Sequence, residues 1–251
     1  MDLEAFRAMP DAQAMLRDLW ETHAPWWHEH FTQGADVEYV DQVIPEVLAR
    51  VGRPRRVLDV GGGEGQVARA IAARTAAEVL VVEPSANQAR EARARGSLVV
   101  RGSAEALPVA SASVDLVTIV LVLEHVLDHA AALAEVARVL EPGGRLVLAL
   151  NHPIIQVPES GLVEDVEAGE TYWRFGRYLA PDVTVEEVAD GVYIPFVHRP
   201  LETYVRAALA AGLVLIDFAE PAPVERWLVS QPAPALLAWL PRLLLTTWER
   251  R

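Results

Sequence analysis

The sequence contains no cysteine. Disulfide bonds, thiolate metal sites and cysteine nucleophiles are therefore excluded, and the chain fits a reducing compartment. Basic residues are also few, because 22 Lys and Arg face 35 Asp and Glu, a formal net charge of −13 at pH 7. A chain of that charge repels nucleic acid on average and needs a local basic patch to bind it.

Long apolar runs are missing too. The N-terminus carries acids and no apolar core, unlike a signal peptide. The most apolar late stretch, residues 233–247, is broken by Pro234, Pro241 and Arg242 and is too short to span a bilayer. We therefore expect a cytoplasmic protein without membrane insertion. With 52% hydrophobic residues, a chain of 251 residues suffices for one large α/β domain with a sizeable core.

The most informative stretch is Val57–Val67, which reads V-L-D-V-G-G-G-E-G-Q-V. A short apolar run breaks into glycines at Gly61, Gly63 and Gly65 and continues into helix-forming residues, which predicts a strand, a tight loop and a helix. Glycine allows a positive φ and lets a ligand lie against the backbone. The free N–H groups of the following helix point into the same loop. We therefore expect a polar small molecule to bind here.

An α/β alternation surrounds this stretch. Apolar runs without a two-residue period are typical of a parallel sheet that is covered on both faces. Such runs predict strands at Val57–Val60, Glu78–Val82, Leu98–Arg101, Val114–Val120 and Leu146–Leu150. Alanine-rich segments between them predict helices at Gln66–Arg74, Ser85–Arg95 and His129–Leu140.

The segments on either side of this region are predicted from their composition and from the positions of their prolines. Residues 1–50 are expected to be helical, with an interruption at Pro25 and a second helix at Val37–Arg50. Residues 152–198 contain prolines, acids and an aromatic cluster, which indicates an inserted cap rather than a separate domain. The last part of the chain predicts one helix and two strands, the second strand at the end of the sheet. They lie at Leu201–Ala211, Leu213–Phe218 and Arg242–Trp248.

Three kinds of ligand use such glycine loops. A phosphate loop needs a Gly-Lys-Ser/Thr, and no lysine follows here. The dinucleotide fingerprint needs a third glycine where this chain has Gln66, which counts against NAD or FAD. The remaining pattern is Asp-x-Gly-x-Gly-x-Gly, with Asp59 two residues before Gly61.

This pattern resembles the class I S-adenosylmethionine-dependent methyltransferases, in particular a type 11-like, stand-alone bacterial subgroup. Five motifs carry the resemblance in that family's order and spacing: V-L-D-V-G-G-G-E-G, V-L-V-V-E-P-S, R-G-S-A-E-A-L-P, V-D-L-V-T-I-V-L-V-L-E-H-V-L-D and L-E-P-G-G-R-L-V-L. They cover roughly residues 57 to 150. The resemblance implies an α/β, Rossmann-like three-layer sandwich, whose seven-stranded and mostly parallel sheet has an antiparallel last strand.

The resemblance also implies one methyltransferase domain over residues 1–251. Residues 1–52 would form an N-terminal helical cover, 53–151 the cofactor-binding core, 152–198 a substrate cap, and 199–251 a C-terminal helix and strands. The expected cofactor is S-adenosyl-L-methionine, with Glu83 accepting hydrogen bonds from its ribose hydroxyls. The residues expected to bind it are Asp59, Gly61, Gly63, Gly65, Glu83, Pro84, Ala104, Glu105, Val120 and Leu121.

The methyl acceptor is expected beyond the carboxyl ends of the strands, under the cap. His152 and His125 are candidate general bases, which are needed only if the nucleophile starts protonated and is not acidic. Each histidine could instead have a structural role, and the aromatic residues of the cap could form the cap's own core. The candidate substrate contacts are Trp27, Glu124, Tyr172, Trp173 and His198.

One pair of histidines invites a metal interpretation. His125 and His129 stand four residues apart, a spacing that can place two ligands on one helical face. A third clear ligand is missing, so no metal site is expected.

The leading hypothesis is methyl transfer to an oxygen, nitrogen or carbon atom of a small apolar or aromatic metabolite. A tRNA methyltransferase acting on a wobble uridine is the alternative, because the loop G-G-G-E-G-Q is similar to one in such a family. The acidic residues of the cap and the lack of a basic tract count against it. A non-catalytic module that binds the cofactor is a third hypothesis, and a nicotinamide enzyme a fourth. A homodimer stays open.

Overall fold

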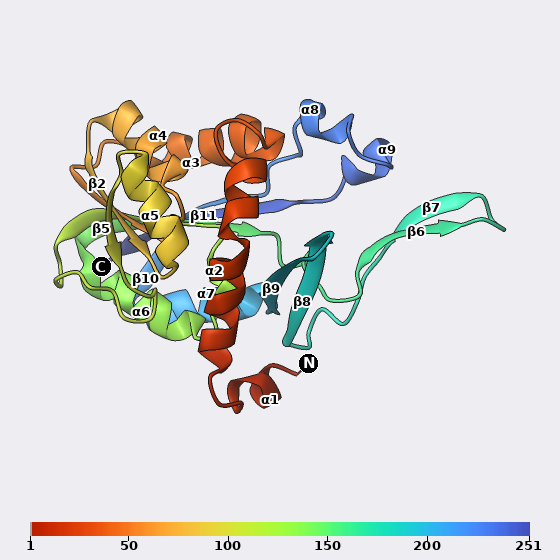
Figure 1. Ribbon diagram of the computed structural model, residues 1–251, viewed down its shortest axis with the longest axis horizontal. Helices are drawn as coiled ribbons and strands as arrows, with labels where there is room; N and C mark the ends of the chain where they lie inside the picture. Colours follow the sequence, from red (N-terminus) through yellow and green to blue (C-terminus); the bar gives the residue numbers. More distant parts are fainter. Residues whose placement is uncertain (1) are drawn as a thin grey trace.

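The computed structural model describes residues 2–251 and is built around a seven-stranded sheet with the order β10-β11-β5-β4-β1-β2-β3 (Figure 1). The strands are β1 (Arg56–Val60), β2 (Glu78–Glu83), β3 (Leu98–Arg101), β4 (Val114–Val120), β5 (Leu140–Asn151), β10 (Leu213–Ala219) and β11 (Leu243–Arg250). β1 to β5 pair in parallel, and β11 is antiparallel to both of its neighbours. The predicted sheet with an antiparallel last strand is confirmed.

The place of β11 was predicted wrongly. It lies between β5 and β10 and not at the end of the sheet. The physical reason is burial: β11 is buried along most of its length, and Leu245 and Trp248 are among its buried side chains. β10 occupies the edge and leaves Ile216 and Phe218 exposed.

Helices cover both faces of the sheet and confirm the three-layer sandwich. α6 (His129–Val139) and α7 (Leu201–Ala210) pack on one face, and α3 (Ile44–Val51) and α4 (Gln66–Thr75) on the other. α5 (Ala86–Ala94) packs beside α4, against β2 and β3. The central strand β4 buries side chains towards both layers, which explains why its sequence is apolar without alternation. None of the helices within residues 2–251 is long and apolar enough to cross a membrane.

The N-terminal segment forms α1 (Leu3–Arg7), α2 (Ala12–Phe31) and a π-helical turn, η1 (Tyr39–Val43), ahead of α3. The predicted interruption at Pro25 is wrong, because α2 continues through it. Proline has no N–H to donate to the carbonyl four residues earlier. That carbonyl, on Glu21, instead accepts a hydrogen bond of 3.0 Å from Asn87 Nδ2 in α5. The missing intrahelical bond is therefore replaced by a contact to the core of the protein.

Residues 152–198 form two hairpins with different surroundings. β6 (Gly161–Asp165) and β7 (Glu170–Arg174) make a ribbon that projects away from the rest of the molecule (Figure 1). β8 (Asp182–Ala189) and β9 (Val192–His198) lie beside α2, and Val183 and Val197 are buried there against α1 and α2. Only the second hairpin therefore packs next to the N-terminal helices. The segment between α7 and β11 adds two short helices, α8 (Glu225–Leu228) and α9 (Pro234–Leu237).

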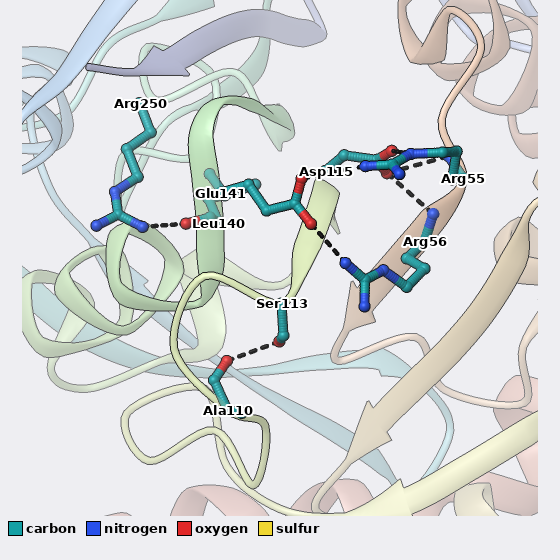
Figure 2. Close-up of polar contacts among 8 residues, drawn as sticks. All are labelled: Arg55, Arg56, Ala110, Ser113, Asp115, Leu140, Glu141 and Arg250. Atoms are coloured by element: carbon teal, nitrogen blue, oxygen red, sulfur yellow. Dashed lines mark hydrogen bonds and ion pairs between the residues drawn. The ribbon is translucent and has the colours of Figure 1, made fainter.

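Ion pairs join the amino ends of β1, β4 and β5. Arg55 donates from its backbone N–H and from Nε to Asp115, and Arg56 Nη2 lies 2.5 Å from Glu141 Oε1 (Figure 2). Both arginine side chains are exposed to solvent, so each pair contributes at most about 1 kcal/mol. The opposite, carboxyl ends of β1 and β4 border a cavity.

The projecting hairpin gives the first prediction. Replacing residues 161–174 with a short Gly-Ser linker should change Tm by less than about 3 °C, because these strands bury no side chain. The matched control replaces residues 183–197 in the same way, which removes Val183 and Val197 from the cluster that holds α1 and α2. Thermal unfolding checks both variants, and a loss of Tm in the first as large as in the second would contradict the distinction between the hairpins.

Candidate cofactor and acceptor site

A cavity of about 690 Å³ opens beyond the carboxyl ends of β1, β2, β3 and β4. Its floor is the loop after β1, and its roof is α2 together with η1. Of the residues expected to bind the cofactor, all but Gly65 line it. The size suits a drug-sized ligand, since such pockets measure about 300–1,000 Å³.

The three glycines of the loop have different reasons for being glycine. All have positive φ: 68° at Gly61, 56° at Gly63 and 84° at Gly65. A Cβ on Gly61 would lie 2.5 Å from Val122 Cγ1, and one on Gly65 would collide with Ser97. A Cβ on Gly63 would meet only the end of Gln88, at 3.5 Å. Gly65 is therefore required by packing at the start of α4, while Gly63 presents its backbone to the cavity.

Two buried carboxyls stand beside the loop. Glu83 Oε2 accepts from the Gly63 N–H at 3.0 Å and Oε1 accepts from the Ser85 N–H at 2.8 Å. Burial nevertheless raises the pKa of Glu83 to about 7. Asp59 accepts from the Thr118 hydroxyl at 2.6 Å, and burial raises its pKa to about 6. Such perturbed acids in a cavity mark a functional site.

An aromatic wall closes the other side of the cavity, and we use this name for Tyr39, Trp27, Trp20 and His125. The ring centroids of Tyr39 and Trp27 lie 5.9 Å apart, those of Trp27 and Trp20 5.3 Å, and those of Trp20 and His125 4.9 Å. Each pair meets edge to face, a favourable arrangement for aromatic rings. All four residues line the cavity.

His125 has a fixed tautomer. Its Nδ1 lies 2.6 Å from the Pro195 carbonyl oxygen, so Nδ1 carries the proton and donates it. Among the described residues, no hydrogen-bond partner meets Nε2, whose lone pair is therefore free. Burial lowers the pKa of His125 to about 4, so the ring stays neutral at physiological pH.

The other residues predicted around the acceptor do not line this cavity. Glu124 is buried behind it, accepts from the backbone and side-chain N–H groups of Asn151 at 3.0 Å, and has a pKa raised to about 7 by burial. His152 accepts from the Ile154 N–H at Nδ1 and donates from Nε2 to Glu220 at 2.8 Å. Both ring nitrogens of His152 are therefore occupied.

The predicted contacts from the cap are also elsewhere. His198 Nε2 lies 2.8 Å from the Tyr178 carbonyl oxygen. Tyr172 and Trp173 belong to β7 in the projecting hairpin, and Trp173 lines a separate cavity of about 470 Å³ between the hairpins. His129 packs against Tyr204, and no group of three possible metal ligands is found among residues 2–251.

Two residues of the aromatic wall were missed from the sequence. Trp20 follows Leu16 by one helical turn, and both face the cavity from α2. This spacing is the signal that could have found Trp20, because an apolar stripe on a covering helix can face a ligand as well as a core. Tyr39 had no local signal, because its position depends on the π-helical turn.

Comparison with known proteins decides the family. A family model described as a methyltransferase domain matches residues 58–148. The ubiquinone/menaquinone biosynthesis C-methyltransferase of Idiomarina loihiensis is 30% identical over 180 residues, which cover 67% of this chain and 70% of that protein. The chain belongs to the class I S-adenosylmethionine-dependent methyltransferases. The predicted family, cofactor and enzyme class are thereby confirmed.

Two further proteins that are similar to this chain are also methyltransferases. The crystal structure of an S-adenosylmethionine-dependent methyltransferase from Mesorhizobium loti is 28% identical, with a TM-score of 0.70, and the match covers 84% of this chain and all of that one. The ubiquinone/menaquinone C-methyltransferase of Rubrivivax gelatinosus is 43% identical over 96 residues, 37% of this chain. That match covers only 38% of the relative's length.

The residues present fit the cofactor. Gly63 leaves room for a ligand on the backbone, the Glu83 carboxylate can accept from ribose hydroxyls, and Asp59 can accept from an ammonium group. Ala104 and Glu105, which are also expected to bind the cofactor, line the same cavity, where Glu105 accepts from Gln13 Nε2 of α2.

The glycine loop gives a second prediction. Gly63→Val should abolish cofactor binding measured by calorimetry, because its side chain would occupy the cavity, while the fold survives. Its positive φ should cost about 1–2 kcal/mol of stability. The matched control is Gly169→Val, which has a φ of 67° and open space around it, far from the cavity. Retained binding in Gly63→Val would remove the loop from the site.

The pKa of Glu83 gives a third prediction. The ionised carboxylate accepts ribose hydrogen bonds better than the protonated acid, so binding favours the ionised form. With the pKa of Glu83 raised to about 7, affinity for the demethylated cofactor should fall about tenfold from pH 8 to pH 6. In Glu83→Gln the affinity should be lower and independent of pH over this range. A persisting dependence would assign it to Asp59 or Glu124 instead.

Proposed function

We propose that this enzyme methylates a small planar acceptor of apolar or aromatic character. The aromatic wall carries the proposal, because three large rings and an imidazole border one end of a cavity whose other end fits the cofactor. Offset or edge-on stacking against such rings favours a flat, weakly polar molecule. Leu16, Val126 and Leu127 extend the same apolar lining.

For methyl transfer, the residues of this chain mainly have to align the acceptor with the cofactor and exclude water. When bound, the cofactor supplies an electrophilic methyl group on a sulfonium, and an in-line approach of the acceptor is required. His125 Nε2 is a polar atom of the aromatic wall with a free lone pair, and it accepts a hydrogen bond from the acceptor. With a pKa of about 4, it orients the acceptor and is a weak base for removing a proton at neutral pH.

This role revises the candidate bases. His125 is proposed as a positioning contact for the acceptor, and His152 is no longer proposed, since both of its nitrogens are engaged outside the cavity. The acceptor atom is then one whose proton is acidic or absent. The two relatives named above are C-methyltransferases of ubiquinone and menaquinone biosynthesis, which supports an acceptor with a ring.

Two alternatives remain testable. A tRNA substrate needs a basic surface, and the cap segment from 159 to 190 contains nine acids and two arginines. A gel-shift with bulk tRNA at low salt that showed clear binding would support it. A non-catalytic module would bind the cofactor tightly and give no methylated product from any metabolite extract.

The test of the proposal uses labelled cofactor. Incubating the protein with a bacterial metabolite extract and S-adenosylmethionine carrying a heavy methyl group should yield a methylated aromatic or apolar product, identified by mass spectrometry. If the labelled products are polar and lack a ring, the proposed acceptor class is wrong.

The fourth prediction concerns the aromatic wall. Trp20→Ala should lower kcat/KM for that acceptor at least tenfold, since it removes one ring and exposes its neighbours to water, while cofactor affinity changes less than threefold. Trp239→Ala is the matched control, because Trp239 is 85% exposed and far from the cavity lining. Equal kcat/KM values in the two variants would contradict the role of the wall.

A further inference from the structure

Arg199 is a buried cation with an unusual set of partners. It lies between β9 and α7 and is 1% exposed. Within residues 2–251 it forms no ion pair with an acid, and its guanidinium lies 5.9 Å from the centroid of the Tyr204 ring. A buried charge is costly unless hydrogen bonds compensate it. The identity of those hydrogen bonds therefore indicates what the residue is for.

Its donors converge on the turn that follows β4. Nη2 donates to the carbonyl oxygens of Val126 at 2.6 Å and Leu127 at 2.8 Å. Nη1 makes longer contacts to the carbonyl oxygens of Leu123 at 3.4 Å and Val197 at 3.5 Å. One planar guanidinium thus gathers carbonyls from both ends of the turn 123–127, which only arginine's fork of donors can do.

That turn forms the acceptor side of the cavity. His125, Val126 and Leu127 all line the cavity. The turn is also tied to β9 through the bond from His125 Nδ1 to the Pro195 carbonyl. The hairpin β8–β9 and the residue that follows it therefore hold the turn at two places, through the Pro195 carbonyl that accepts from the His125 ring and through the Arg199 side chain.

We propose that Arg199 is a positioning residue, which fixes the turn 123–127 so that His125 presents Nε2 to the acceptor. The inference rests on the proposed function of His125 and extends it to a residue that touches neither cofactor nor acceptor. A functional group aligned for transfer needs such rigid support, because a misplacement of about 1 Å costs about a hundredfold in rate. The cofactor end is supported separately, by Glu83 and the glycine loop.

The experiment compares Arg199→Met, Arg199→Lys and a control, Arg206→Met. Methionine keeps an unbranched apolar stem and removes every donor, whereas lysine keeps the charge with a single nitrogen that cannot span the same carbonyls. Arg206 lies on the adjoining helix α7, its side chain is 77% exposed, and its one ion pair with the residues from 2 to 251 is to Glu202. All three are made in the full chain.

The decisive readout is the tautomer of His125, observed by ¹⁵N NMR of the imidazole and assigned with His125→Gln. The wild type and Arg206→Met should show the neutral ring protonated at Nδ1. Arg199→Met should show an averaged signal, at least a tenfold fall in kcat for the acceptor, and affinity for the demethylated cofactor within about threefold of the wild type. Arg199→Lys should lie between them.

Each other outcome overturns the inference. A folded Arg199→Met with the wild-type tautomer and kcat would show that the turn needs no such support. If that variant does not fold, Arg199→Lys decides by the same criterion. If neither folds while Arg206→Met does, Arg199 is a residue of the core only. Should His125→Gln methylate normally, the proposed function of His125 fails while the NMR result for Arg199 still stands.

Discussion

The hydrogen bond between the Gly63 N–H and the Glu83 carboxylate is the contact on which the cofactor end of the cavity depends. It joins the loop after β1 to the carboxyl end of β2, at a distance of 3.0 Å. The loop can reach Glu83 only because Gly61, Gly63 and Gly65 all adopt positive φ, which side chains with a Cβ rarely tolerate. This hydrogen bond thus shapes the floor of the cavity and places the Glu83 carboxylate there, where it can accept hydrogen bonds from a ligand.

The other half of the cavity depends on α2, a helix that continues through Pro25. α2 brings Leu16, Trp20 and Trp27 over the ends of the strands. Its lost backbone bond at Pro25 is replaced by Asn87, and the Glu21 side chain accepts from Ser85 and Asn87 as well. The covering helix is therefore anchored to the segment after β2, next to Glu83. The aromatic wall and the carboxylate that faces it are held by neighbouring parts of the chain.

The sequence was sufficient where the signal is local. The strands, the glycine loop and Glu83 are each specified within a few residues, so the sheet could be predicted, and so could most of the residues that line the floor of the cavity. The position of β11 in the sheet could not be predicted. Whether β10 or β11 forms the edge depends on which of the two strands is covered on both faces in the folded protein. His152, Tyr172 and Trp173 look like site residues in the sequence, yet long-range contacts place them outside the cavity: Glu220 engages His152, and the hairpin β6–β7 carries the two aromatic residues away.

Three buried acids lower the stability of the folded protein at neutral pH. Burial raises the pKa of Asp59 to about 6 and those of Glu83 and Glu124 to about 7. An acid whose pKa is higher in the folded than in the unfolded state destabilises the fold above its folded pKa. That penalty is relieved as pH falls from about 7 towards the unfolded value. A protein selected for stability alone would replace these groups with apolar ones. Asp59 and Glu83 line one cavity, and their presence there is explained by a ligand that carries a positive charge and hydroxyl donors, both of which the cofactor of this family has.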